Sequence, residues 1–312
     1  SATTMVAASP RFSLREDIDY GVCDGAQSEV DGARQAATFA RPNGLAYNLA
    51  TGFIDTTSYS ACTVRRIRIS DGDVSLFAGA YQVIATTNGV GAAARFKNPA
   101  AVACDASGNT FVAEMQSSKI RKILPDATVS TWAGAAWGYG EGTGTGAMFK
   151  NPGSVATSGS EVYVADGAGD RIRKIDAAQL TTTIGGNGNA GYSDVGAGQF
   201  SGPTGVAVDG AVNAFVVDKN NLRIRKITAA LVVSTVAGTG ASGTNVGAGA
   251  SSQFTTPRHV AVDMNGDLYV GDGERVVRIV QDASFTTTLF ITRDGAELTL
   301  QANVELPIEM NM

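Results

Sequence analysis

Short stretches of alternating apolar and polar residues recur along most of the chain, whereas the 3.6-residue period of amphipathic helices is absent. Turns rich in Gly, Asp and Asn bound these stretches. Examples are "GVAVD" (Gly205–Asp209), "LYVGD" (Leu268–Asp272) and "VSTVAG" (Val233–Gly238). Such a pattern predicts short β-strands joined by tight turns. We therefore expect an all-β protein.

The strands recur in a fixed order. Five units open on a Phe-x-x-Pro sequence, and their first residues are Phe39, Phe96, Phe149, Phe200 and Phe254. Each unit contains four predicted strands, a to d in chain order, and a Gly-rich loop follows strand d. Repeats of roughly 40–50 residues with four strands apiece are typical of the blades of a β-propeller.

The third predicted strand is basic, with "RIRKI" at Arg171–Ile175 and Arg223–Ile227 and "KIRKI" at Lys119–Ile123. Because side chains alternate between faces, these strands carry Ile on both faces, as expected for a strand covered on both sides. We predict that an arginine of strand c pairs with an acid that closes strand b. The acids are Asp55, Glu114, Asp166, Asp218 and Asp272; the arginines are Arg65, Arg121, Arg173 and Arg225, with Val277 as the exception. The basic motif is thus interpreted as structural.

The units resemble NHL repeats, a family of propeller blades. The segments that carry the resemblance are Pro203–Asp209, Val162–Asp166, Arg171–Ile175 and Val233–Gly238. The similarity extends from Phe39 to Ile291, although the Asn-His-Leu that names the family is missing. The resemblance implies a β-propeller, most often of six blades.

We expect a single propeller domain over residues 1–312 with six blades, although only five units are visible. Residues 1–38 and 292–312 are the expected closing segments. The sixth blade would take two strands from 296–310 and two from 4–8 and 12–21. The alternative is a five-bladed ring, with residues 292–312 beginning another domain.

The loops between strand d of one unit and strand a of the next are long. They are expected on one face of the ring, called the upper face, and they carry Tyr81, Trp137, Tyr139 and Tyr192. Loops on a rigid scaffold often form binding sites. We predict that these aromatic residues bind a protein or a glycan, the other interpretation being that they fold back over their own loops.

The three cysteines fall on different faces. Cys23 and Cys62 are both expected on the upper face and form the candidate disulfide, whereas Cys104 ends a strand a and is predicted to be a buried free thiol. A Cys23–Cys62 disulfide would imply an oxidising compartment. We therefore expect an extracellular or secretory location.

Catalytic signals are weak. His259 is the only histidine, and Asp105, Asp209 and Asp263 end three inner strands, where carboxylates can bind Ca²⁺. The interpretation we favour is that each Asp opens a tight turn and that His259 is simple variation. The alternative is a lyase or hydrolase that uses a metal in the central channel.

Charge limits the partners further. The net charge is −5 and the pI is near 5.0, which does not suit a protein that neutralises nucleic-acid phosphates. No apolar stretch approaches the roughly 20 residues of a membrane span. We therefore predict a non-catalytic scaffold for protein–protein interaction, within a larger assembly or by self-assembly. The alternatives are the channel enzyme and a glycan-binding propeller.

Overall fold

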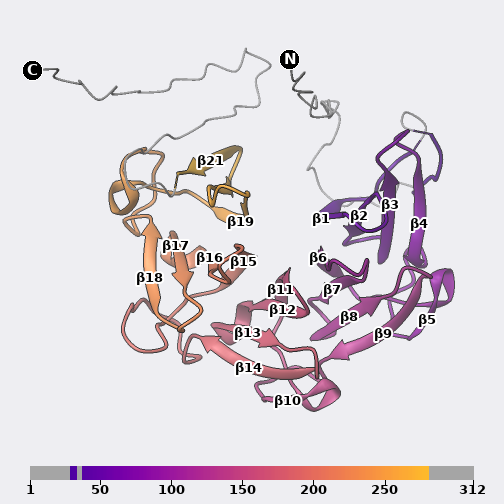
Figure 1. The fold of residues 1–312 in the computed structure, drawn as a ribbon, viewed down its shortest axis with the longest axis horizontal. Coiled ribbons are helices and arrows are strands. Elements are labelled where there is room, and N and C mark those ends of the chain that lie inside the picture. Colours follow the sequence, from indigo (N-terminus) through magenta and orange to yellow (C-terminus); the bar gives the residue numbers. More distant parts are fainter. Residues whose placement is uncertain (1–28, 34–36, 281–312) are drawn as a thin grey trace, which may run out of the picture.

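The computed structural model describes residues 29–33 and 37–280. Their β-strands form five antiparallel sheets arranged as blades around a common centre (Figure 1). The innermost strands are β1, β6, β11, β15 and β19, and the arc is open between the first and fifth blades (Figure 1). The all-β propeller architecture expected from the sequence is confirmed.

The strands follow the predicted order within each blade. The first two blades comprise β1 (Pro42–Asn48), β2 (Phe53–Ser58), β3 (Thr63–Arg68), β4 (Val74–Gly79), β6 (Pro99–Cys104), β7 (Thr110–Glu114), β8 (Lys119–Ile123) and β9 (Thr128–Ala133). The third and fourth comprise β11 (Pro152–Ser158), β12 (Glu161–Asp166), β13 (Arg171–Ile175), β14 (Leu180–Gly185), β15 (Pro203–Val208), β16 (Ala214–Asp218), β17 (Arg223–Ile227) and β18 (Val233–Ala237). The fifth comprises β19 (Pro257–Val262), β20 (Leu268–Asp272) and β21 (Arg275–Ile279).

The described residues form five blades, whereas the sequence favoured six, with five as the alternative. The strands expected within 4–8, 12–21 and 296–310 lie outside the described residues. The fourth strand expected in the fifth blade also lies outside the described residues. Among the described residues, no helix has the length and apolarity needed to cross a membrane.

Each inner strand begins with the proline of the Phe-x-x-Pro sequence. Proline is tolerated at the first residue of a strand because the ladder does not yet need its missing N–H group. The pairing register shifts directly afterwards, for example between Pro203 and Gly205 opposite β16. The Phe-x-x-Pro motif therefore marks the point where each inner strand begins with an irregular pairing register.

Apolar side chains fill the space between adjacent blades. Four clusters of buried residues join the first blade to the second and so on to the fifth. Ile172 and Ile175 of β13 point to opposite faces, and both are fully buried. The strand is thus covered on both sides, as its sequence predicted.

The inter-blade loops also contribute to the sheets. Two of them add a short strand to the outer edge of the following blade, namely β5 (Gly89–Val90) beside β9 and β10 (Gly142–Thr143) beside β14 (Figure 1). Short 3-10 helices occur in these loops and in the b–c connections: η1 (Gly91–Ala93), η2 (Gly144–Gly146), η3 (Gly167–Gly169), η4 (Lys219–Asn221) and η5 (Gly249–Ser251). The inter-blade loops therefore extend two of the sheets in addition to connecting the blades.

The a–b turn of the fourth blade contains a residue whose backbone conformation is unfavourable. Val212 has φ +64°, whereas Gly108 occupies the same turn position in the second blade with φ +82°. A left-handed conformation costs an L-residue roughly 1–2 kcal/mol, whereas glycine adopts it freely.

We expect Val212→Gly to raise the free energy of unfolding by about 1 kcal/mol in a denaturant titration. The matched Gly108→Val variant should lose stability, and a gain there would contradict this explanation.

Candidate functional site

Buried arginines fasten the inter-blade loops to the sheets. The Arg225 guanidinium is fully buried and donates to the Asp218 Oδ2 atom (2.9 Å) and to the Gln199 carbonyl oxygen (2.9 Å). It also donates to the Ser193 carbonyl oxygen (2.6 Å) and to the Asp194 carboxylate. One side chain of β17 thereby joins the second strand of its blade to two points on the preceding loop.

The same arrangement occurs in the second blade. Arg121 donates to Glu114 (2.9 Å), to the carbonyl oxygens of Arg95 and Thr87 (3.0 Å each) and to Asn88 (2.9 Å). Both Arg121 and Glu114 are fully buried. The predicted pairing of a strand-c arginine with a strand-b acid is therefore confirmed for Arg121 and Arg225.

The first blade departs from this pattern. Its second strand is longer than expected, so Thr56 lies opposite Arg65, and Asp55 lies opposite Arg66. The Arg66 Nε atom donates to Asp55 Oδ1 (3.1 Å), whereas Arg65 pairs with Asp31 in the preceding segment. The predicted Asp55–Arg65 pair is wrong, because the pairing register of β2 and β3 places Asp55 opposite Arg66.

The fifth blade lacks an arginine at the usual position, which Val277 occupies. Arg275, two residues earlier, takes over the role. It donates to Asp272 (2.7 Å) and to the carbonyl oxygens of Gln253 (2.9 Å) and Thr244 (3.0 Å). A different strand position thus supplies the same link between sheet and loop.

Two of the four predicted binding aromatics stack on arginines. The Arg171 guanidinium lies 3.8 Å from the Tyr139 ring centroid, and the Arg223 guanidinium lies 3.9 Å from that of Tyr192. Arg173 also contacts the Tyr139 ring at 5.1 Å. Each tyrosine remains partly exposed, but a guanidinium already faces its ring.

Trp137 differs from the two tyrosines. Its side chain is 63% exposed, and the Lys150 ammonium lies 5.1 Å from its ring. A parallel bridge to Phe149, whose side chain is fully buried, holds its backbone. Tyr81 is also exposed and lies in a different loop, between the first and second blades. Trp137 is therefore a large apolar side chain on a fixed backbone.

The channel carboxylates stabilise their own turns. The Asp105 Oδ1 atom accepts the N–H groups of Ser107 and Asn109 (2.9 Å each), and the Asn109 amide donates to Oδ2 (2.7 Å). Asp209 and Asp263 accept equivalent N–H groups in the fourth and fifth blades. No group of three His, Cys, Asp or Glu side chains within the described residues is arranged to hold a metal ion.

His259 lies on β19 beside Arg258, and both side chains are exposed. Partial removal of the imidazole from water and then the nearby Arg258 charge lower the pKa of His259. Both effects favour the neutral imidazole. At the equivalent position of the fourth blade, Gly205 faces the next blade.

Of the three cysteines, the structure describes Cys62 and Cys104. Cys62 is buried in the b–c connection of the first blade, while Cys23 and the predicted disulfide lie outside the described residues. Cys104 is a partly buried free thiol. Burial and then the Asp55 carboxylate raise the pKa of Cys104 to about 12, so the thiol is unreactive at neutral pH.

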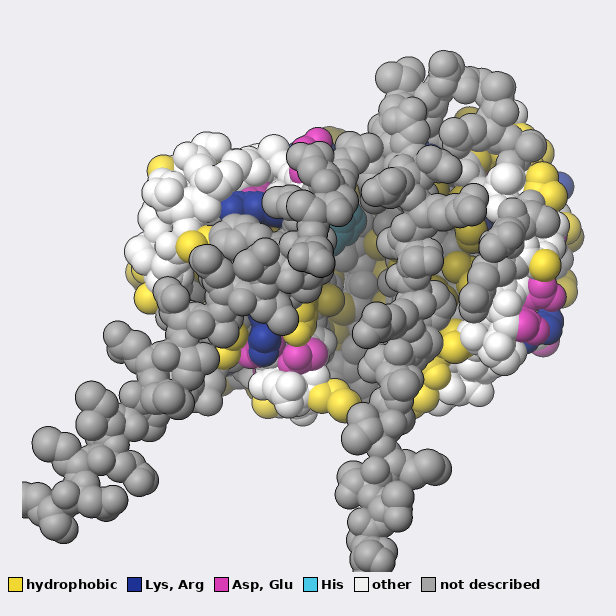
Figure 2. Space-filling model, turned by 90° about the horizontal axis from the view of Figure 1, so that it is seen from above, with side chains coloured by type: hydrophobic (Ala, Val, Ile, Leu, Met, Phe, Trp, Pro, Cys, Tyr) yellow, Lys and Arg dark blue, Asp and Glu magenta, His cyan; other side chains and the backbone are white. Residues whose placement is uncertain are grey.

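Figure 2 shows one face of the molecule. The visible Lys and Arg side chains stand in small groups with acidic neighbours, and no continuous basic area appears among the coloured residues. The coloured residues of this face therefore form no concentrated charge of either sign.

Comparisons with known proteins support the fold. No family model matches the chain. A segment of the Arabidopsis thaliana protein SUPPRESSOR OF QUENCHING 1, chloroplastic, is 29% identical over 131 residues, which is 38% of this chain and 12% of that protein. The chain therefore spans only a small part of that curated relative.

Two solved structures have similar propellers. A gluconolactonase from Xanthomonas campestris, XC5397, gives a TM-score of 0.57 at 12% identity, covering 81% of this chain and 77% of that one. A chain of the nidogen/laminin complex gives 0.56 at 16% identity, with 79% and 81% covered. Identities this low show a shared β-propeller fold.

Asp166, the predicted partner of Arg173, lacks the direct hydrogen bond to arginine that Glu114 and Asp218 accept. Asp166 is buried, but its Oδ2 atom lies 3.8 Å from Arg173 and has no hydrogen-bond partner among the described residues. In the fourth blade the Asn221 amide donates to the equivalent Asp218 oxygen (2.8 Å), whereas the third blade has Gly169 there. Burial raises the pKa of Asp166 to about 7, even though the Lys150 N–H group and Arg173 favour the charged form.

This shift predicts a pH dependence of stability. Between about pH 5 and pH 7 the unfolded chain has already released this proton, whereas the folded chain retains it, so stability should fall as pH rises. We expect Asp166→Asn to reduce this fall by about 2–4 kcal/mol in denaturant titrations at several pH values. Asp126→Asn, at an exposed turn carboxylate with a lowered pKa, is the control and should leave the slope unchanged. Equal slopes in all three proteins would contradict the assignment.

Proposed function

We propose that the protein is a non-catalytic β-propeller that binds a protein partner through its inter-blade loops. The observation that carries this proposal is Trp137, exposed on a loop that Arg173 fastens through the carbonyl oxygens of Gly140 (2.9 Å) and Met148 (3.1 Å). A large aromatic side chain on a preorganised backbone loses little entropy on binding. Tryptophan is also among the residues enriched at the centres of protein interfaces.

The loop between the third and fourth blades carries a second exposed apolar residue. Val195 is 85% exposed, and its loop is fastened by Arg225. Tyr81, with Val83 and Ile84, is exposed on the loop after the first blade. These side chains support a binding surface distributed over several loops, and the partner can be another protein or a second copy of the chain.

The glycan-binding alternative receives less support. A sugar stacks on an open aromatic face, but guanidinium groups already cover one face each of Tyr139 and Tyr192. Trp137 is the most exposed of the four predicted residues, but the Lys150 ammonium lies over its ring. These two tyrosines support loop structure better than they support a sugar site.

The channel-enzyme alternative depends on the gluconolactonase likeness and on His259. The solved structures favour neither function, because the gluconolactonase and the nidogen/laminin chain resemble this chain equally well. The side chains favour binding, since Asp105, Asp209 and Asp263 are each engaged within their own turn. A bound calcium ion would need these turns to rearrange.

The proposal also covers the type of repeat and the number of blades. We propose that the repeats are of NHL type and that the chain ends supply a sixth blade. Leu45 on the free flank of the first blade is 63% exposed, whereas Val206 at the same position inside the arc is 4% exposed. An apolar flank left open in this way favours a covering element.

The flank of the fifth blade adds a constraint. His259 stands where the inner strands of the other blades carry the small residues Gly44, Ala101, Ser154 and Gly205. A Cβ atom on Gly205 would lie 2.9 Å from the Arg258 carbonyl oxygen of the next blade. A sixth blade would therefore have to fit around a larger side chain than the other blades do.

An extracellular or secretory location, with the Cys23–Cys62 disulfide, completes the proposal.

The Trp137→Ala variant tests the binding surface. We expect it to weaken binding of the partner by at least about tenfold, because a central aromatic contributes on the order of 2 kcal/mol or more. The unfolding midpoint should stay close to that of the wild type, since the side chain is mostly exposed. The measurement is a titration against a protein captured by the wild type from its natural source and then purified.

Two variants serve as controls. Val232→Ser, at an exposed apolar residue of the turn between β17 and β18 and outside the proposed surface, should leave binding unchanged. Tyr139→Ala removes a ring stacked on Arg171 and Arg173 and should lower stability as well as binding. Unchanged affinity in Trp137→Ala would exclude this loop from the interface.

A further inference from the structure

Asn187 lies on the loop between the third and fourth blades and is followed by Gly188. The Cγ atom of an asparagine can be attacked by the backbone nitrogen of the next residue, and glycine hinders this attack least because it has no Cβ atom. The chain has three other Asn-Gly pairs, which begin at Asn43, Asn88 and Asn265. The hydrogen bonds of the structure distinguish Asn187 from these three.

The glycines of the other three pairs are held in hydrogen-bonded structure. The Gly44 N–H group donates to the Thr57 hydroxyl (2.9 Å). The Gly266 N–H group donates to the Asp263 carbonyl oxygen (3.1 Å) within its own turn. Gly89 lies in β5 and is paired with β9. These arrangements must open before the glycine nitrogen can attack.

Asn187 lacks this restraint. Its side chain is exposed, and the Gly188 N–H group has no hydrogen-bond partner in the part of the chain that the structure describes. The Asn189 N–H group donates to Asn187 Oδ1 (2.9 Å). This bond folds the side chain back over the Gly188 peptide group and withdraws electrons from Cγ. Both the attacking nitrogen and the carbon that it attacks are therefore available.

Arg171 acts on the same peptide group. Its Nη2 atom donates to the Asn187 carbonyl oxygen (2.9 Å), and its Nη1 atom donates to that of Gly169 (2.9 Å). A charged donor on the Asn187 carbonyl makes the Gly188 N–H group more acidic, which favours the nucleophilic form of the nitrogen. The guanidinium also requires glycine at 188, where φ is +86° and a Cβ atom would lie 2.0 Å from Nη1.

We propose that Asn187 is a site of spontaneous deamidation. The Gly188 nitrogen loses its proton and bonds to Asn187 Cγ. The Cγ–Nδ2 bond breaks, and the departing nitrogen takes up a proton and leaves as ammonia. Water then opens the resulting succinimide ring at either of its carbonyl groups, which gives aspartate or isoaspartate. Water is the only co-reactant, and no group is oxidised or reduced.

The reaction changes the charge beside Arg171, whose guanidinium stacks on Tyr139. Within residues 29–33 and 37–280, Arg171 donates to carbonyl oxygens and forms no ion pair. A carboxylate at position 187 would supply one. Isoaspartate would also add a methylene group to the backbone and displace the carbonyl oxygen that Arg171 holds. Modification of one residue would therefore alter the conformation of the loop.

The loop between the fourth and fifth blades suggests a matched variant. There Arg223 donates to the Thr239 carbonyl oxygen (2.6 Å). The Ala241 N–H group donates to the Thr239 hydroxyl (3.1 Å), and Gly240 has φ +87°. The same turn thus forms with threonine in place of asparagine. Asn187→Thr should keep the fold and remove the reacting group.

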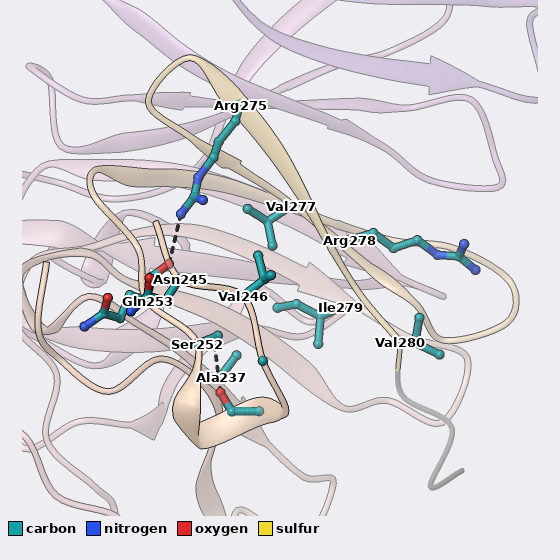
Figure 3. Close-up of a pocket in the computed structure, with 12 residues that line it drawn as sticks. Ala237, Asn245, Val246, Ser252, Gln253, Arg275, Val277, Arg278, Ile279 and Val280 are labelled. Atoms are coloured by element: carbon teal, nitrogen blue, oxygen red, sulfur yellow. Dashed lines mark hydrogen bonds between the residues drawn. The ribbon is translucent and has the colours of Figure 1, made fainter. Parts of the chain in front are cut away.

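An asparagine in that same loop is an internal negative control. Asn245 precedes Val246 (Figure 3), whose branched side chain hinders attack by its own nitrogen. Val246 also lines a cavity with Val277 and Ile279. Asn245 should therefore remain intact while Asn187 reacts.

Peptide mapping of the full-length protein tests the proposal after incubation in warm, mildly alkaline buffer, with the chain either folded or unfolded in guanidinium chloride. In the unfolded chain the four Asn-Gly pairs should deamidate at similar rates. Folding should slow Asn43, Asn88 and Asn265 at least about threefold, because their glycines are hydrogen-bonded, and should not slow Asn187. Asn187→Thr should keep the wild-type unfolding midpoint and lose most of the isoaspartate.

Two outcomes would overturn the proposal. One is that folding slows Asn187 as much as Asn265, and the other is isoaspartate at the wild-type level in Asn187→Thr. Arg171→Met tests the positioning role of the guanidinium. It should slow deamidation at Asn187 at least about twofold and leave Asn265 unchanged. An unchanged rate at Asn187 would contradict the role given to Arg171.

Discussion

Burial of a guanidinium within a sheet is the constraint on which the loop structure depends. Removing such a charge from water costs several kcal/mol unless its donors find partners. In Arg225 the partners are one carboxylate of the sheet and two carbonyl oxygens and a carboxylate of the preceding loop. The loop must keep its conformation for the arginine to remain satisfied, so the stability of the blade and the shape of the loop are coupled.

This coupling explains how glycine-rich loops can present a defined surface. Glycines let the backbone turn sharply but also make a free loop flexible. Arg173 holds the loop before the third blade at Gly140 and Met148, and a bridge to Phe149 holds the backbone of Trp137. A rigid ring with fastened loops suits recognition of a partner, and the channel carboxylates, each satisfied within its own turn, do not require a reaction to explain them.

The sequence predicted the features that depend on local pattern. Alternation located the strands, the repeat located the blades, and the spacing of acid and arginine predicted the buried pairs at Arg121 and Arg225. Features that depend on register or on distant chain were not predictable. The Asp55 prediction failed because Ser58, three residues later in β2, occupies the position that Asp218 has in β16, while Asp55 lies opposite Arg66. Arg275 replaced the missing arginine from another strand position, and the outer strands β5 and β10 involve Gly-rich segments with no strand pattern.

The exchange rates of the loop amides in an Arg225→Met variant test the central claim most directly. The reporters are the N–H groups of Gly191, Gly198 and Gln199, which are hydrogen-bonded within the loop or to Phe200. If Arg225 holds the loop, these amides should exchange at least about tenfold faster than in the wild type while β11–β14 keep their protection. In Lys226→Met, the matched variant on the same strand whose ammonium contacts the Phe215 ring of β16, they should change little. Unchanged protection in Arg225→Met would show that the loop holds its conformation without the buried arginine and would contradict the account.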